Sequence, residues 1–196
     1  MEILVSMPLK AFQRNRNLLC ALLVAAGWII GAFVAFAQKS LPEFQIKAAF
    51  LINFPKYVEW PATAFAETNS PIVIAVLGET KVTAELQKII AGRTISGRKI
   101  VLKHLTPDET PSSFHVLFIS AAEQKTSSNL LAKLKDGGVL TVGESSDFLE
   151  RGGIINLVQR NQNIVMEVNL TAANQAHIKI SSKLLELANV VKGKAN

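Results

Sequence analysis

The sequence contains few residues whose types and spacing would support nucleotide binding. In an α/β domain, a phosphate is held by a glycine-rich turn between a strand and the N-terminus of the next helix. Here that turn reads Leu77-Gly78-Glu79-Thr80, with one glycine and a carboxylate where a phosphate would lie. The pairs Gly137-Gly138 and Gly152-Gly153 lack the spacing of a dinucleotide or phosphate-binding motif. We therefore expect these glycines to form turns, and we predict no cofactor.

Metal binding and nucleophilic catalysis have equally little support. His104, His115 and His177 are isolated from one another and from close-spaced acidic residues, so each is interpreted as a surface or helix-end residue. Ser120 follows an apolar run, as catalytic serines sometimes do, but it lacks the flanking glycines of a nucleophile elbow. The single cysteine, Cys20, lies in the apolar N-terminal run. We predict no catalytic residue and no metal site, which favours a binding protein over an enzyme.

Two polar features remain as candidate sites for a ligand or partner. Residues 145–151 read as a short capped helix that delivers Arg151 and Gly152 to the next strand, and a glycine there would let a backbone or ligand approach closely. The alternative is a plain tight turn. Glu167 and Asn169 are predicted on the polar face of the last strand, with Lys179 shortly after. These three could form an anion- or zwitterion-binding spot or a partner-facing edge, or only a solvated face with a weak ion pair.

The elements that must position these residues alternate between helix and strand. Residues 42–60 show helical spacing of aromatic and apolar side chains, interrupted at Pro55, where the helix should bend or stop; Trp60 is expected in the core. Strands are predicted over residues 72–77, 100–105, 116–119 and 139–142, and helices after Thr80 and after Ser127 or Ser128. The alternation predicts a parallel, Rossmann-like sheet within one three-layer α/β domain.

The C-terminal part is predicted to complete a mixed sheet. Apolar residues alternate with polar ones over residues 164–170, and the preceding run 152–159 is almost wholly apolar. Asparagines in the connection 160–163 tolerate a left-handed turn, so the two runs should form an antiparallel hairpin. The chain then leaves the sheet at Thr171. The stripe Leu184, Leu187, Ala188 and Val191 predicts a terminal amphipathic helix.

The N-terminus has the pattern of a secretory signal peptide. Arg14 and Arg16 precede an apolar run over residues 18–36, which ends in Ala35-Phe36-Ala37. We expect residues 1–37 to be a cleaved signal peptide and residues 38–196 to be a periplasmic domain; an uncleaved anchor is the alternative, because the run is long enough to span a bilayer. The formal net charge is +6, but the Lys and Arg residues form no run interleaved with aromatics, so nucleic-acid binding is not expected.

Several short blocks, in their order along the chain, resemble the YfiR family of periplasmic repressors of membrane-bound diguanylate cyclases. They are IKAAFLINFPKYVEWP, SGRKIVLKHL, GGVLTVGES, FLERGGIINLV, and MEVNL followed by KISSKLLELA. The sequence departs from the family at Pro55 and in having no cysteine after Cys20, whereas members often carry cysteine pairs associated with redox sensing. A redox role is therefore not carried over.

The resemblance implies a specific function. A family member would bind the periplasmic portion of an inner-membrane diguanylate cyclase, hold it inactive and so lower cyclic-di-GMP and biofilm formation. It would also be sequestered by an outer-membrane OmpA-like lipoprotein. Separately from the resemblance, we hypothesise that the domain can pair as a homodimer. The residues alone leave a second function open, a periplasmic small-ligand receptor acting with a sensor kinase or transporter, because a Rossmann-like layer has a crevice at its strand ends.

Overall fold

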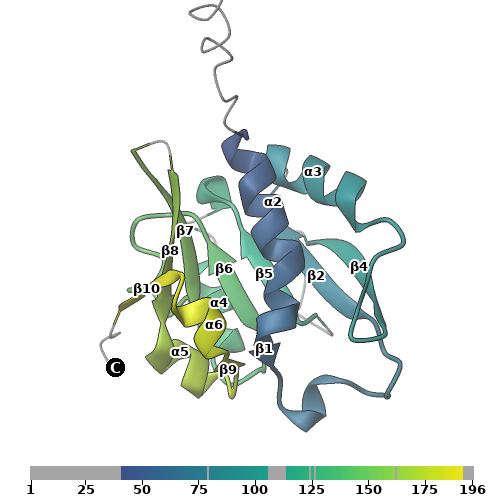
Figure 1. The fold of residues 1–196 in the computed structure, drawn as a ribbon. Coiled ribbons are helices and arrows are strands. Elements are labelled where there is room, and N and C mark those ends of the chain that lie inside the picture. Colours follow the sequence, from purple (N-terminus) through teal and green to yellow (C-terminus); the bar gives the residue numbers. More distant parts are fainter. Residues whose placement is uncertain are drawn as a thin grey trace, which may run out of the picture. The chain divides into compact units, whose positions relative to one another are not determined.

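The computed structural model of the protein describes residues 41–78, 80–105, 114–123, 125, 127–161 and 163–191. These residues belong to one compact unit, Leu41–Asn196, whose ribbon is drawn in Figure 1. The expected signal peptide, residues 1–37, lies outside the described residues. Within the described ranges, no helix is both long enough and apolar enough to cross a membrane.

Among the described residues, most strands join one mixed sheet of eight, in the order β10-β8-β7-β6-β5-β2-β4-β3. Strands β4, β2, β5, β6 and β7 run parallel; β8 pairs antiparallel with β7, and β10 pairs parallel with β8. A separate two-stranded ladder joins β1 to β9. The strands are β1 (Val58–Glu59), β2 (Ile72–Leu77), β3 (Thr94–Ile95), β4 (Arg98–Leu105), β5 (Val116–Ile119), β6 (Leu140–Gly143), β7 (Ile155–Arg160), β8 (Asn163–Asn169), β9 (Lys179–Ile180) and β10 (Ala188–Val191).

Helices cover both faces of this sheet, which confirms the predicted three-layer α/β fold. In Figure 1, α2 and α3 lie side by side across one face. Residues 74 and 76 of β2 pack into the core on that face, whereas residues 75 and 77 pack into a second core that contains Leu131 and Leu134 of α4. The helices are α2 (Glu43–Asn53), α3 (Lys81–Ile90), α4 (Ser128–Leu134), α5 (Leu170–Gln175) and α6 (Ser182–Leu185), with short 3-10 turns η1 (Phe54–Tyr57), η2 (Ala62–Ala64) and η3 (Ala121–Glu123).

The interruption expected at Pro55 is confirmed. The α-helical hydrogen bonding of α2 stops at Asn53, and Pro55 lies at the start of η1, where its missing N–H is tolerated. The chain then becomes extended at Val58 and Glu59, which pair with Ile180 and Lys179. The N-cap predicted at Thr80 is also present, since its hydroxyl accepts a hydrogen bond from the Thr83 N–H at 3.4 Å.

Three predictions about local structure are wrong. The chain forms only the four-residue α6 where a terminal helix was expected, and residues 188–191 extend as β10 because the open edge of β8 offers them backbone hydrogen bonds. Residues 145–151 form consecutive turns and no helix. His115, interpreted as a surface residue, is buried at the start of the central strand β5.

Candidate functional site

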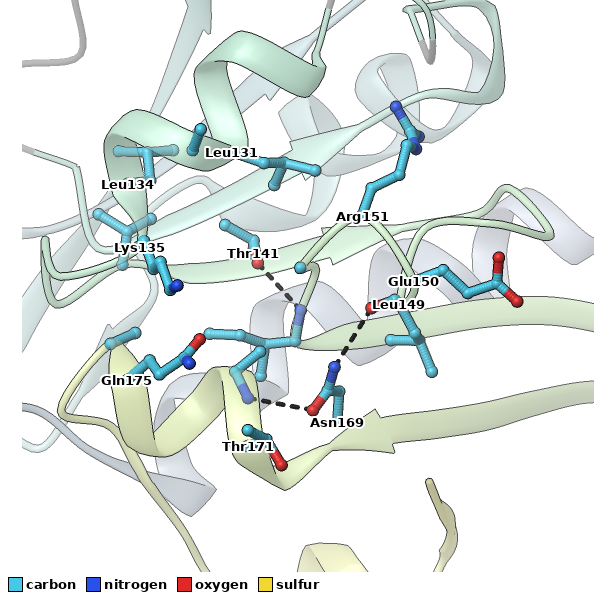
Figure 2. A pocket seen from close by; sticks show the side chains of 16 residues that line it. Leu131, Leu134, Lys135, Thr141, Leu149, Glu150, Arg151, Asn169, Thr171 and Gln175 are labelled. Carbon is cyan, nitrogen blue, oxygen red and sulfur yellow. Dashed lines mark hydrogen bonds between the residues drawn. The ribbon is translucent and has the colours of Figure 1, made fainter. Parts of the chain in front are cut away.

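A cavity of about 270 Å³ brings together three of the five residues predicted to bind a ligand or partner, Arg151, Gly152 and Asn169. It lies between α4, the turns that precede β7, and the start of α5 (Figure 2). Its apolar lining comes mainly from both buried cores: Leu131, Leu134, Val139, Leu149, Ile154, Ala172 and Ala176. Lys135 and Glu150 are exposed at its rim.

The polar atoms at the bottom of the cavity are already engaged. Asn169, which was predicted on the polar face of the last strand, is buried because the end of β8 is covered on both sides. Its Oδ1 accepts from the Ala172 N–H at 3.0 Å and so caps α5, and its Nδ2 donates to the Leu149 carbonyl at 3.2 Å. The Thr141 hydroxyl accepts from the Ile154 N–H at 3.0 Å. These groups fix the walls of the cavity.

Arg151 has a structural position beside the cavity. Figure 2 shows its guanidinium pointing away from the other labelled side chains. It forms an ion pair with Asp147, with 3.1 Å between Nε and Oδ2, and Nη1 donates to the hydroxyls of Ser127 and Ser128 at 3.2 Å each. Arg151 therefore fastens the turns before β7 to the N-terminus of α4.

The glycine pair after Arg151 has two different explanations. Gly152 has φ +92°, a conformation that L side chains rarely adopt, but a Cβ there would meet no atom within 4 Å. At Gly153 a Cβ would lie 2.1 Å from Cε1 of Phe148, and at Gly143 one would lie 2.4 Å from the same ring. The close approach expected at this turn is thus made by the buried ring of Phe148.

The remaining two predicted residues lie outside the cavity. Glu167, in β8, forms an ion pair with Arg160 at 2.5 Å and accepts a hydrogen bond from Asn156 Nδ2 at 3.5 Å. Lys179 is exposed in β9, opposite Glu59 of β1. The structure therefore does not bring the predicted set of Glu167, Asn169 and Lys179 together as one pocket.

A second polar cluster, which the sequence reasoning missed, lies at the carboxyl ends of the central strands. Lys47 of α2 is buried, and its Nζ contacts carboxylate oxygens of Glu43 and, at 2.6 Å, of Glu144, which follows β6. Burial acts to lower the pKa of Lys47, but the hydrogen bonds to Glu144 and Glu43 and the charges of these two carboxylates together outweigh it and raise the pKa above 10.5. The other oxygen of Glu144 accepts from the Ala121 N–H at 3.0 Å.

Ser120 lies beside this cluster but does not form a catalytic constellation. Its hydroxyl is buried against Gly78 and has no hydrogen-bond partner in the part of the chain that the structure describes. No described histidine or acid is hydrogen-bonded to it. Among the described residues, no group of three His, Cys, Asp or Glu side chains could hold a metal ion.

Comparison with known proteins gives one family and two distant structures. A family model described as YfiR/HmsC-like (DUF4154) matches residues 44–189. No curated protein matches the chain. A conserved domain protein of Vibrio cholerae O1 biovar El Tor is 16% identical with a TM-score of 0.50, and the match covers 77% of this chain and 60% of that one. The ABC domain in complex with L-Trp from Streptococcus pneumonia is 10% identical with a TM-score of 0.49, over 76% and 60% of the two chains.

These structural matches concern the fold alone. The chain spans about 60% of the length of each solved structure. The similarity to the Vibrio protein is consistent with the α/β sheet described above, whereas the family match covers most of the chain from α2 to β10.

Proposed function

This chain belongs to the YfiR/HmsC-like family, and on that premise we propose that it binds the periplasmic portion of an inner-membrane diguanylate cyclase and represses it. Membership of this family supports a regulatory role in cyclic-di-GMP signalling in general. Repression of a cyclase would lower cyclic-di-GMP and biofilm formation. The family match is the observation that carries this proposal, and the surface of the molecule suggests where the partner binds.

The outer edge of β10 is the surface that we assign to the partner. Its backbone has no strand partner among the described residues, so N–H and C=O groups of this edge are open to an extended segment of another protein. Leu187, Val190 and Val191 expose 74%, 48% and 41% of their surface along it. Exposed apolar side chains at an open strand edge favour a protein partner.

The opposite edge of the sheet, at β4 and β3, is protected against pairing with strands of other chains. There the short β3 covers the beginning of β4, and β4 itself carries Arg98, Lys99 and Lys103. Basic side chains and short edge strands discourage pairing with other chains. Strand β10, with the sequence ANVV, has no charge and no proline. The contrast between the two edges supports β10 as the binding surface.

Repression through this edge requires a difference in affinity between two states of the cyclase. A repressor that binds the inactive arrangement more tightly shifts the population toward it, whereas equal affinity for both states would change nothing. An OmpA-like lipoprotein of the outer membrane that competes for the repressor would restore activity. A homodimer formed through the same edge would compete with the cyclase in the same way.

Co-purification from membrane extracts tests the proposal, together with cyclic-di-GMP in a deletion strain. We expect a diguanylate cyclase to co-purify with the wild-type protein and cyclic-di-GMP to rise on deletion. Val190→Lys should weaken binding by about tenfold or more, because it places a charge in the centre of an apolar contact. Val101→Lys is the matched control, since Val101 is exposed to a similar degree (43%) on β4, at the other side of the sheet. Absence of any cyclase and unchanged cyclic-di-GMP would refute the proposal.

The cavity beside α4 favours a second candidate function, a periplasmic receptor for a small ligand that acts with a sensor kinase or transporter. Its volume of about 270 Å³ would accommodate only a small molecule. The internal pairing of Asn169, Thr141 and Arg151 leaves the apolar side chains of the lining and the polar rim residues for recognition. A kinase or permease, in place of a cyclase, among the co-purified proteins would favour this function.

A further inference from the structure

The imidazole of His115 holds the polar connection between β1 and β2 against the sheet. Nδ1 lies 3.1 Å from the Val73 backbone nitrogen, whose N–H can only donate, so Nδ1 must be unprotonated. Nε2 lies 3.1 Å from the Ala64 carbonyl oxygen, which can only accept, so Nε2 must carry the hydrogen. One neutral tautomer of His115 therefore satisfies both neighbours, and the protonated form does not.

Aromatic rings complete this contact. The ring of Phe65 stacks on His115 with 4.2 Å between the ring centroids and 18° between the planes. Trp60 meets both rings edge-on, and its Nε1 donates to the His115 carbonyl at 3.3 Å. On the far side, the Arg98 guanidinium lies 3.9 Å from the centroid of the Phe65 ring. Arg98 also donates to the carbonyls of Glu67 at 3.2 Å and Ser70 at 2.6 Å.

Apart from these contacts with His115, Trp60 and Arg98, the connection is weakly packed. None of residues 61–71 is fully buried, and η2 contributes no buried side chain. A segment with few buried apolar contacts opens at a lower free energy than the core beneath it. In contrast, the backbone of His115 is fixed within the sheet, because its N–H donates to the Val73 carbonyl at 2.9 Å and its carbonyl accepts from Leu140 at 2.9 Å. The backbone of His115 therefore stays in place, and the connection over residues 61–71 is the part that can move.

We propose that His115 is an acid-operated latch: a proton on its Nδ1 releases residues 61–71 from the sheet while the sheet stays folded. A proton on Nδ1 would point at the Val73 N–H, so two donors would face each other and the hydrogen bond would be lost. The charged ring would also be less favourable between Phe65 and the sheet. Release would expose Phe65 and Trp60.

Burial of His115 and the nearby charge of Arg98 oppose protonation of its imidazole in the closed form. Burial lowers the pKa of His115 most, the hydrogen bond to the Ala64 carbonyl raises it, and the charge of Arg98 on β4 lowers it further. The groups that face His115 from β2 and β6 are the backbone groups of Val73 and Leu140. Within the connection, Glu67 approaches through its carbonyl, which Arg98 binds, and its side chain is exposed.

The sign of the pH dependence follows from this lowered pKa. Above the ordinary value of 6.5, the open and closed forms are both neutral at His115 and the latch has its full strength. As the pH falls below 6.5, the open form takes up a proton before the closed form does, so opening becomes easier. The effect levels off once the pH is below the pKa of the closed form.

Hydrogen exchange, resolved by peptide and corrected for intrinsic rates, tests the latch in the full-length protein between pH 7.5 and 5.0. We expect exchange over residues 61–71 to increase several-fold as the pH falls below 6.5, while peptides from β5 stay protected. His115→Gln keeps an acceptor and a donor but does not titrate, so it should abolish the pH response. His115→Phe keeps a stacked ring without either hydrogen bond, so it should exchange rapidly at both pH values.

The other described histidines provide the control. The control variant combines His104→Gln with His177→Asn. Glutamine can keep a hydrogen bond to Gln87, whose Nε2 lies 3.0 Å from His104 Nε2. Asparagine tolerates the φ of +55° at position 177, so the second substitution avoids backbone strain. This double variant should keep the full pH response. The latch is refuted if residues 61–71 are equally protected at pH 7.5 and 5.0 in the wild type, or if the double variant loses the response. Because no partner is needed, this result is independent of the proposed repression of a cyclase.

Discussion

At the scale of single residues, Lys47 links helix α2 to the carboxyl edge of the sheet. Glu144 contacts Lys47 with one oxygen and the Ala121 N–H with the other, so one carboxylate joins three segments. The second carboxylate, Glu43, is in the first turn of α2 and more exposed to solvent. The two partners of one buried ammonium should therefore contribute unequally to stability.

We predict that Glu144→Ala lowers the free energy of unfolding by about 1–3 kcal/mol, because it leaves a buried donor and part of a buried charge unpaired. Glu43→Ala should cost less than about 1 kcal/mol, since exposed ion pairs contribute little. Urea unfolding at pH 7 measures both. The raised pKa of Lys47 gives stability that is complete below pH 10.5 and is lost as the pH rises through the higher folded value. Equal effects of the two substitutions would contradict this interpretation.

The residues that form these contacts could not be found from sequence patterns. Lys47 and Glu144 are separated by 97 positions, and neither belongs to a motif. His115 gives no local signal for its burial either, because its partners Val73 and Ala64 come from a neighbouring strand and a distant connection. The sequence does indicate Arg151 and Asn169 as candidate binding residues. Their bonds to Ser127, Asp147 and the Leu149 carbonyl depend on the tertiary fold.

At the scale of elements, Asn169 ends β8 and begins α5. Its side chain caps the helix and also holds the turn that contains Leu149. We predict that Asn169→Ala costs about 1–3 kcal/mol, from the lost cap together with a buried carbonyl left without its donor. Asn169→Ser should cost less, because serine is also a good N-cap. Thr171→Ala, at the lining of the same cavity, should change stability by less than about 0.5 kcal/mol.

Thermal or urea unfolding of these three variants separates a structural role for Asn169 from a purely functional one. A wild-type stability in Asn169→Ala would exclude the structural role.

The element that sequence patterns predicted wrongly lies further along the chain, at β10. The apolar stripe from Leu184 to Val191 fits a helix, but an extended backbone at residues 188–191 can hydrogen-bond to the open edge of β8. Local periodicity carries no information about that edge.

At the scale of the whole molecule, the central strands contribute to both cores at once. In β5, Val116 and Phe118 pack on the face of α2 and α3, whereas Leu117 and Ile119 pack on the face of α4. A strand shared in this way couples the two layers. The alternation of continuous apolar runs with capped helices made this architecture predictable, since strands covered on both faces must be apolar throughout.

We predict a single cooperative unfolding transition for the described domain. Leu117→Ala should lower its stability by about 2–5 kcal/mol, because the side chain is fully buried. The loss should shift the far-UV and near-UV circular dichroism transitions together, since both layers depend on β5. Two separate midpoints in this variant would show that the layers unfold independently.

The ladder between β1 and β9 also constrains how the protein is made. Val58 and Glu59 are synthesised well before their partners, Ile180 and Lys179, because the two strands are far apart along the chain. A nascent chain therefore cannot form this ladder until residues 179–180 have left the ribosome, so β1 stays without its partner strand while the central sheet is being synthesised.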